Sequence, residues 1–278
     1  MMKEGSSDNY IKSIKLTFKY LTNYFGKEKN ISEIDRADAG KFIASLRKTA
    51  PDGYRVYFRN LKAAFNVAVD WEYIAINQFT KVKLPKKQKE APAYITPKEF
   101  DLILDKMKNK TLKAIVHYAF FTGSRRNEIL NLRWKHLDLS KKTITIGDKD
   151  FKTKTGKQRI IPMGKYLHDE LLKWEKSRKK KDLKPDSLVF GKTGEFSYHE
   201  DVPTKAFKRA CRDAGIDDRI HFHSLRHSFA SYLVQNKVNL YNIQKLLGHC
   251  SITTTEIYAH LDIDSLKESV KAFDSIKK

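Results

Sequence analysis

One segment of the chain reads His221-Phe222-His223-Ser224-Leu225-Arg226-His227-Ser228-Phe229-Ala230, the pattern of a helix with a polar and an apolar side. Because His223, Arg226 and His227 are three and four positions apart, they project together from such a helix. That face suits a phosphate group. A metal ion competes, but the arginine and the lack of a third carboxylate or cysteine ligand argue against it. The plainest interpretation is a solvated helix face. The opposing apolar stripe consists of Leu225, Phe229 and Tyr232 or Leu233.

Downstream, Leu246-Leu247-Gly248-His249 precedes a run from Ser251 to His260 that is rich in β-branched residues. Gly248 is suited to end one helix, and Ser251 is suited to cap the next. Because β-branched residues weaken that next helix, we expect it to present a side chain rather than pack it. Considered alone, Tyr258 is an ordinary half-buried tyrosine.

Upstream, Thr122-Gly123-Ser124-Arg125-Arg126-Asn127-Glu128-Ile129 places a glycine and two arginines at a helix start. Backbone N–H groups and arginines that face the same way favour an anion. Arg125 and Glu128 are three positions apart, so they share a face and can pair. The alternative is a purely structural arginine–glutamate pair.

Strands are expected between these segments. Residues 143–146 and 159–161 alternate or are β-branched, and the turn-forming residues 152–157 lie between them. A domain start is expected at Thr96-Pro97-Lys98-Glu99, which has the pattern of a capping box. Helical patterns run from there to about Leu132, with an interruption at Thr122-Gly123, and return after Met163.

The first eighty residues predict helices with basic flanks. Ile11, Ile14, Phe18, Leu21 and Phe25 form one apolar stripe. Further helices are expected from about Asp38 and, after the break at Pro51-Asp52-Gly53, from Tyr54. Residues 81–92 contain two prolines and many lysines without helical period, which indicates an extended linker; a solvated surface loop is the alternative.

Composition favours a polyanionic partner. Among 278 residues, 55 Lys+Arg against 33 Asp+Glu give a formal charge of +22. Nucleic acid is the leading candidate, although a ribosomal or chromatin protein would have similar charge. Anionic membrane is the alternative, but no apolar run is long enough to span one. The N-terminus does not resemble a signal peptide. The two cysteines, Cys211 and Cys250, fit a reducing compartment, so we expect a cytoplasmic protein.

Each motif has an ordinary explanation, but their ordered combination resembles the tyrosine recombinase (phage integrase) family. The elements are Arg-x-x-Glu, a lysine in a β-turn, His-x-x-Arg-His, and Leu-Gly-His followed nine residues later by tyrosine. The resemblance covers essentially the whole chain. It implies a mostly α fold with a small antiparallel sheet, arranged as a two-domain C-shaped clamp. The implied domains are a helical core-binding domain (1–80), a basic linker (81–95), and a catalytic domain with a C-terminal tail (96–278).

The resemblance also implies roles for individual residues. Tyr258 would attack the scissile phosphate and form a 3′-phosphotyrosyl bond, with a Holliday junction during strand exchange. Arg125 and Arg226 would neutralise the phosphate oxygens, and Lys154 would protonate the departing 5′-oxygen. Lys154 fits because Lys-Thr-Gly precedes a basic strand that ends at Pro162; Lys152 and Lys157 are neighbours that could be mistaken for it. His223 would handle the tyrosine proton and His249 would bind the phosphate. Glu128 and His227 would be supporting residues, and the linker lysines Lys81, Lys83, Lys86 and Lys87 would contact DNA.

The implied partners are double-stranded DNA and further copies of the chain, as a free monomer and a tetramer in the synaptic complex. Accessory DNA-bending proteins are also implied. No metal, cofactor or membrane is expected, and the source would be bacterial or phage-encoded. The tail after Tyr258 would pack on a neighbouring subunit or on its own domain.

Two departures from the family pattern stand out. Ser124 replaces a usual apolar residue. The core-binding helices begin near Asn9, so the protein is expected to be either a simple recombinase of two domains or one whose arm-binding domain is not part of this sequence. Two other functions remain open: a type IB topoisomerase, which would relax supercoils without two sites, and a DNA-binding regulator, which would form no covalent adduct.

Overall fold

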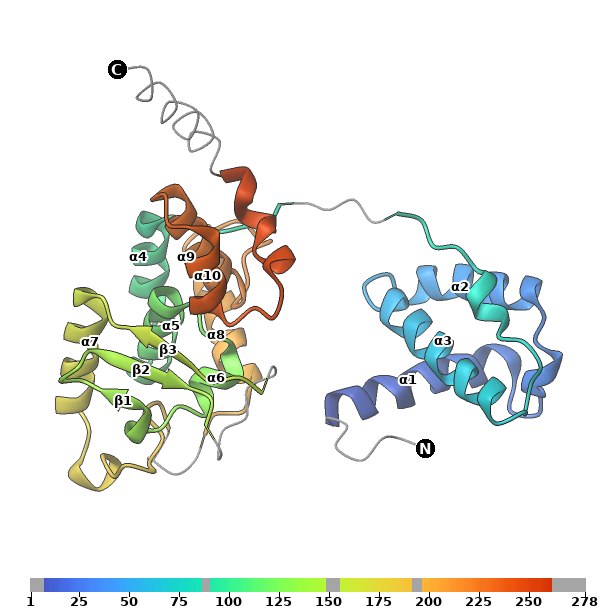
Figure 1. Ribbon diagram of the computed structural model, residues 1–278, viewed down its shortest axis with the longest axis horizontal. Coiled ribbons are helices and arrows are strands. Elements are labelled where there is room, and N and C mark those ends of the chain that lie inside the picture. The colour runs from blue at the N-terminus through green and yellow to red at the C-terminus, as the bar shows by residue number, and fades with distance from the viewer. Residues whose placement is uncertain (1–7, 87–90, 149–155, 192–196, 262–278) are drawn as a thin grey trace, which may run out of the picture. The chain divides into compact units, whose positions relative to one another are not determined.

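A computed structural model describes residues 8–86, 91–148, 156–191 and 197–261 of the chain. The chain divides into two compact units, residues 1–88 and 89–278, and each unit has its own hydrophobic core. The described elements are mostly helical with one small antiparallel sheet, which confirms the expected fold class (Figure 1). No helix in these four ranges is long and apolar enough to cross a membrane.

Unit 1 is helical and has an aromatic core. It contains α1 (Asp8–Phe25), α2 (Arg36–Thr49) and α3 (Tyr54–Asp70), with 3-10 turns at Ile31–Glu33 and Gln78–Lys81. The buried core includes Leu21, Phe42, Ile43, Leu46, Phe58, Leu61, Phe65 and Phe79. The predicted stripe on α1 is wrong at Phe18, which is 37% exposed. Thr17 points inward instead, because its hydroxyl accepts a hydrogen bond from the buried Asn60 amide at 3.0 Å.

The chain beyond α3 continues along unit 1 as an extended segment. Val82 and Leu84 pack against the core of this unit, whereas Lys81, Lys83 and Lys86 are exposed. Because extended residues alternate between two sides, Lys83 faces away from the side of Val82 and Leu84. Lys87 lies outside the described residues.

Unit 2 carries the remaining elements. Its helices are α4 (Pro97–Lys106), α5 (Lys110–Thr122), α6 (Arg126–Leu130), α7 (Lys165–Lys176), α8 (Asp201–Asp213), α9 (Ser224–Gln235) and α10 (Leu240–Leu247), with 3-10 turns at Trp134–His136, Lys180–Asp182, Ile252–Thr254 and Glu256–Leu261. The capping box predicted at Thr96 and Glu99 is present. A second interruption, which the sequence did not indicate, occurs at residues 107–109, where the Asn109 side chain caps the N-terminus of α5.

The sheet of unit 2 has the strand order β1-β2-β3, with both pairs antiparallel. It consists of β1 (Leu137–Asp138), β2 (Thr143–Ile146) and β3 (Arg159–Pro162). The two predicted strands are confirmed, and β1 is the strand that the sequence did not single out. On β3, Ile161 is buried and Ile160 is 63% exposed. Because strand residues alternate, Arg159 shares the inward face of Ile161.

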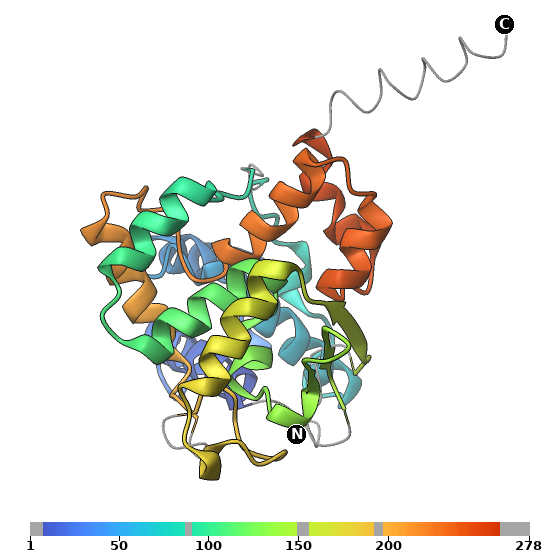
Figure 2. The same ribbon diagram turned by 90° about the vertical axis from the view of Figure 1, so that its left-hand side faces the viewer.

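Three helices meet closely at the centre of unit 2. α9 packs against α5 and α10, and α9 and α10 lie side by side in Figure 2 (orange to red). Gly123 ends α5 with a φ of +60°. A Cβ atom at Gly123 would lie 2.6 Å from Phe229 Cδ1 and 2.8 Å from Leu247 Cδ2. A glycine is therefore required here both for its backbone conformation and for the close approach of α9 and α10.

Candidate active site

The guanidinium of Arg226 is buried where α5, α9 and α10 meet. Arg226 lies in the first turn of α9 and is 3% exposed. Its Nη1 donates to the Gly123 carbonyl and its Nη2 to the Leu247 carbonyl, each at 2.7 Å. This side chain therefore ties the end of α5 to the end of α10.

Arg125 reaches the same place from the loop before α6. Its Nη2 donates to the Gly248 carbonyl at 3.2 Å, one residue beyond the carbonyl that Arg226 contacts. The predicted pair with Glu128 is present, at 3.0 Å from Arg125 Nη1 to Glu128 Oε1, and Glu128 also accepts the backbone N–H of Arg125. Ser124 is buried, as an apolar residue would be. The structure thus brings together the two arginines that the sequence predicted.

Three histidines surround these arginines. His223 immediately precedes α9, and its ring lies 5.0 Å from the ring of His227, centroid to centroid. His249 follows Gly248, and its Nδ1 lies 2.8 Å from the hydroxyl of Thr255. His227 Nδ1 lies 2.6 Å from the hydroxyl of Tyr258. The Thr255 hydroxyl therefore orients the His249 ring, while His227 is the described histidine that contacts the tyrosine.

The electrostatics of this cluster favour an anion. Burial, reinforced by Arg226, lowers the pKa of His223 and of His249 to about 4. The pKa of Arg226 is lowered to about 9, mainly by burial and next by the charge of the neighbouring Arg125. Solvent screens the lowering of the histidine pKa more at His223, which is exposed, than at His249, which is partly buried. Neutral histidines beside crowded guanidiniums are what a site awaiting a phosphate would show.

Tyr258 is packed rather than presented, so that sequence-based expectation is wrong. The predicted weakness of its helix is confirmed, since residues 252–254 and 256–261 form 3-10 turns. The ring is nevertheless 2% exposed and belongs to a cluster with Ala230, Val234, Ile243 and Leu247. Burial raises the pKa of Tyr258 to about 12. The gain from burying an aromatic ring against α9 and α10 outweighs the weak local helix.

The predicted general acid cannot be located. Lys154 and its neighbour Lys152 lie outside the described residues. Lys157 is described and lines a cleft of about 510 Å³ together with Arg159, Gly248 and His249. Lys157, the last residue of the predicted turn, and His249 thus border the same cleft.

Arg159 is a buried residue that sequence reasoning missed. Its Nη2 and Nη1 lie 2.6 and 3.1 Å from the carboxylate of Glu128, and its Nε donates to the Leu246 carbonyl at 2.9 Å. Its side chain is only 8% exposed. The signal that could have found it is strand parity, because Arg159 lies two positions from the inward-facing Ile161 on the predicted strand.

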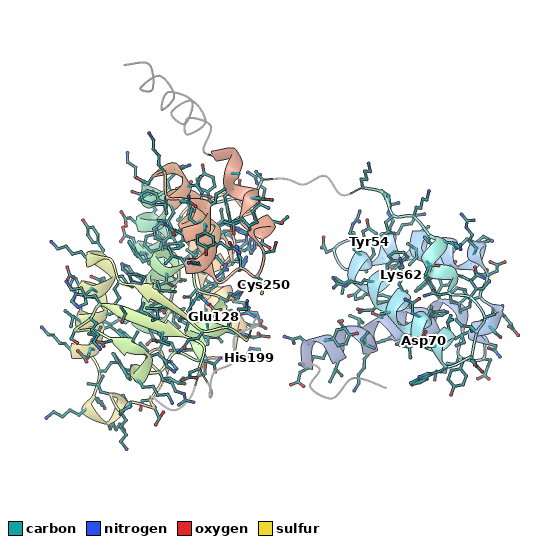
Figure 3. All side chains as sticks on the ribbon, viewed as in Figure 1. Tyr54, Lys62, Asp70, Glu128, His199 and Cys250 are labelled. Atoms are coloured by element: carbon teal, nitrogen blue, oxygen red, sulfur yellow. The ribbon has the colours of Figure 1, made fainter. Side chains whose placement is uncertain are left out.

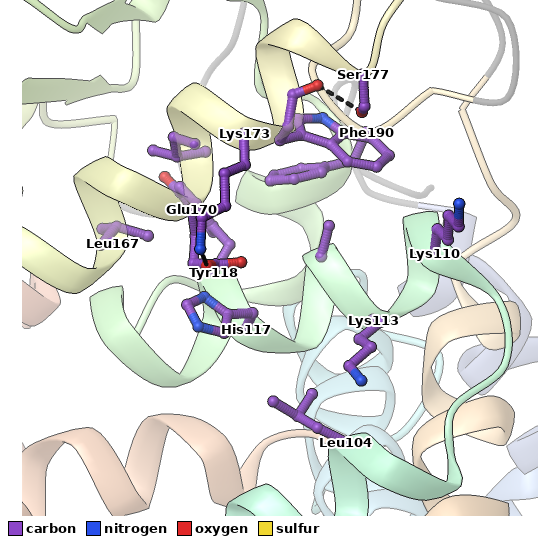
Figure 4. A pocket seen from close by; sticks show the side chains of 13 residues that line it. Leu104, Lys110, Lys113, His117, Tyr118, Leu167, Glu170, Lys173, Ser177 and Phe190 are labelled. Atoms are coloured by element: carbon purple, nitrogen blue, oxygen red, sulfur yellow. Dashed lines mark hydrogen bonds and ion pairs between the residues drawn. The ribbon is translucent and has the colours of Figure 1, made fainter.

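Other features of unit 2 lie apart from this cluster. A cavity of about 430 Å³ between α5 and α7 is lined by His117, Glu170 and Lys173, and it contains none of the predicted site residues (Figure 4). Glu128 and Cys250 mark the region of the site in Figure 3. Within the described ranges, no group of three or more histidine, cysteine or acidic residues is arranged to hold a metal ion.

Comparison with known families gives two matches that together span most of the chain. Residues 93–264 match the phage integrase family, and residues 1–84 match the phage integrase SAM-like domain. The chain is 27% identical to the tyrosine recombinase XerD of Listeria monocytogenes serotype 4b over 292 aligned positions, covering 98% of this chain and 95% of the relative. It is 26% identical to the tyrosine recombinase XerC of Pediococcus pentosaceus, covering 95% and 90%.

Solved structures share the fold. The Tn1549 transposon integrase in complex with a circular intermediate DNA superposes with a TM-score of 0.82 at 20% identity, covering 97% of this chain and 95% of that one. A lambda integrase dimer bound to a core site superposes with a TM-score of 0.76 at 17% identity, covering 92% and 90%.

Proposed function

The chain belongs to the phage integrase family, and we propose that Tyr258 is the nucleophile with which this tyrosine recombinase cuts and rejoins DNA. The protein is a site-specific DNA recombinase, an enzyme that breaks and rejoins DNA strands. One observation carries the assignment of its site: Arg125 and Arg226 gather at the end of α10, next to His249, while His227 on the same helix as Arg226 contacts Tyr258.

The proposed reaction conserves the energy of the phosphodiester bond. The Tyr258 oxygen attacks the scissile phosphorus, a 3′-phosphotyrosyl bond forms, and the bond to the 5′-oxygen breaks. The tyrosine proton passes to a base, and an acid protonates the leaving 5′-oxygen. Because the phosphotyrosyl ester can be attacked by the 5′-hydroxyl of another strand, rejoining through a Holliday junction needs no nucleotide cofactor.

Arg125 and Arg226 would stabilise the charge that builds on the non-bridging oxygens. A guanidinium can donate two parallel hydrogen bonds to a phosphate, and catalysis of phosphoryl transfer depends mostly on such positioning and neutralisation. In the free chain these donors point to the carbonyls of Gly123, Leu247 and Gly248. We propose that the phosphate shares or replaces these acceptors, with His249 as a further donor.

We assign the acceptor of the tyrosine proton to His227, whereas the sequence-based expectation was His223. The separation of 2.6 Å between His227 Nδ1 and the Tyr258 hydroxyl supports His227 as the proton acceptor, with His223 left to hold the phosphate. Burial lowers the pKa of His227 to about 4, so it is neutral and able to accept a hydrogen bond. A bound phosphate raises that pKa by its charge and favours transfer during attack.

Lys154 remains our proposal for the acid that protonates the 5′-oxygen. We also propose that the exposed lysines beyond α3 follow the DNA backbone and that the two domains close on the duplex as a clamp. A tetramer around two duplexes, with accessory DNA-bending proteins, would complete strand exchange, in the cytoplasm where bacterial DNA lies. The exposure of Lys81, Lys83 and Lys86 supports the backbone contact.

A nicked suicide substrate tests the nucleophile. Wild type and Tyr258→Phe are incubated in EDTA with a duplex that carries the target site, and covalent adducts are separated on a denaturing gel. We expect an adduct with wild type and none with Tyr258→Phe, at equal DNA affinity. An adduct that persists in the variant would reject Tyr258 as nucleophile.

A further inference from the structure

Three guanidiniums contact three successive carbonyl groups at the end of α10. Arg159 Nε donates to Leu246, Arg226 Nη2 to Leu247 and Arg125 Nη2 to Gly248, at 2.9, 2.7 and 3.2 Å. The last carbonyls of a helix lack partners within the helix and carry its negative partial charge, so cations are stabilised there. The next residue is His249.

Glu128 links two of these arginines from the other side. Its carboxylate is 4% exposed and contacts both Arg159 and Arg125. Burial by itself would raise the pKa of Glu128, but the hydrogen bond and charge of Arg159 hold it below its ordinary value. Glu128 is therefore ionised, and its position depends on Arg159 at least as much as on Arg125.

The donors of Arg159 face the protein. Nε, Nη1 and Nη2 all contact Glu128 or Leu246, and the side chain is almost fully buried. Arg159 also lies against the turn at Gly248, where a Cβ atom would be 3.0 Å from Arg159 Nη1 and 3.1 Å from Cδ. The cation of Arg159 thus supports the residues that surround the phosphate site rather than the phosphate itself.

We propose that Arg159 is a positioning residue for DNA cleavage: through Glu128 it fixes Arg125, and through the Leu246 carbonyl it fixes the turn that carries His249. The inference rests on the proposed function of this site. A lysine cannot reproduce the role, because one ammonium group lacks the planar fork that spans a carboxylate and a carbonyl.

The first test compares Arg159→Lys with a matched control, Arg178→Lys. Arg178 is also largely buried, pairs with the Asp182 carboxylate at 3.6 Å and donates to the Gly191 carbonyl, but it lies in a different part of unit 2. We measure the rate of covalent adduct formation at saturating DNA, the dissociation constant for the same DNA, and the thermal midpoint. Arg159→Lys should slow cleavage by about 10–100-fold, as loss of a supporting partner does elsewhere, while DNA affinity changes little. Arg178→Lys should cleave at the wild-type rate.

A double variant separates positioning from stability. Arg159→Gln alone removes one of the two cations that pair with the buried carboxylate of Glu128 and should lower stability. Arg159→Gln combined with Glu128→Gln removes both charges and should recover much of the lost stability. We expect the double variant to remain folded and slow. Wild-type cleavage by Arg159→Lys, or recovery of both stability and cleavage in the double variant, would overturn the inference. Failure of the wild type to form an adduct would instead reject the proposed function.

Discussion

The hydroxyl of Tyr258 lies within hydrogen-bond distance of a neutral His227 in the free chain; Tyr258 is buried and His227 is partly buried. Burial raises the pKa of Tyr258 to about 12 and lowers that of His227 to about 4. The proton therefore stays on the tyrosine until a phosphate arrives. This arrangement keeps Tyr258, our proposed nucleophile, protonated in the absence of DNA.

His227→Asn tests this contact. The Asn oxygen can accept the hydrogen bond from Tyr258 but cannot take up its proton, so the variant should bind DNA normally. Its rate of adduct formation should fall by about 100-fold, the lower end of what a general base contributes. The rate is measured with the nicked substrate at saturating enzyme. Cleavage at the wild-type rate would return the proton-acceptor role to His223.

The partly buried histidines also predict how stability depends on pH. The folded-state pKa values of His227 and His249, about 4, lie below the ordinary value of 6.5. The unfolded chain therefore binds more protons between these values, and stability must fall as pH drops through that window. We expect the thermal midpoint of the DNA-free protein to be lower at pH 5 than at pH 7.5, with a smaller difference in His227→Asn. A midpoint that does not change would contradict the buried, neutral state of these rings.

At the scale of elements, the site depends on the close approach of α5, α9 and α10. The arginines are positioned by helix ends: Arg226 in the first turn of α9, Arg125 before α6, and the acceptor carbonyls at the end of α10. A change that separates these helices should therefore affect stability and cleavage together.

Gly123→Ala is such a change. The new Cβ would contact Phe229 and Leu247 at 2.6 and 2.8 Å, and the φ of +60° disfavours alanine. We expect a loss of about 2–4 kcal/mol in the free energy of unfolding, from backbone strain and overpacking combined. Chemical denaturation measures it. Gly164→Ala is the control, because a Cβ there meets nothing within 4 Å and its φ of −66° suits alanine. Equal losses in the two variants would contradict this account.

At the scale of the whole molecule, the formal charge of +22 predicts that DNA binding weakens steeply with salt. The exposed lysines of the segment beyond α3 are our proposed backbone contacts. Replacing Lys81, Lys83 and Lys86 with alanine should make the slope of log affinity against log salt shallower by about 0.9 for each lysine that contacts a phosphate. The slope is obtained by fluorescence anisotropy with a labelled duplex.

The control for that experiment removes the same charge elsewhere. Lys179, Lys180 and Lys181 are exposed near a 3-10 turn of unit 2, and their replacement with alanine should leave the slope nearly unchanged. Equal slopes for both triple variants would mean that overall charge, rather than the segment beyond α3, governs binding.

Local patterns in the sequence determined much of this protein. Caps and chain breaks act over a few residues, so the capping box at Thr96 and Glu99 and the helix end at Gly248 were predictable. Strong periodicity predicted the helices of unit 1 and the strands β2 and β3. The order and spacing of the motifs identified the family, and with it the arginines that the structure brings together.

Only the tertiary structure decided how the site is organised. The bonds from Arg226 to Gly123 and from Arg159 to Leu246 join residues 103 and 87 positions apart, and no local pattern encodes such contacts. The burial of Tyr258 likewise depends on its packing against the apolar faces of α9 and α10. The residues next to Tyr258 favour only a weak helix and do not by themselves predict that burial. Side-chain burial and charge pairing are properties of the packed chain, because they arise only when distant segments exclude water from one another.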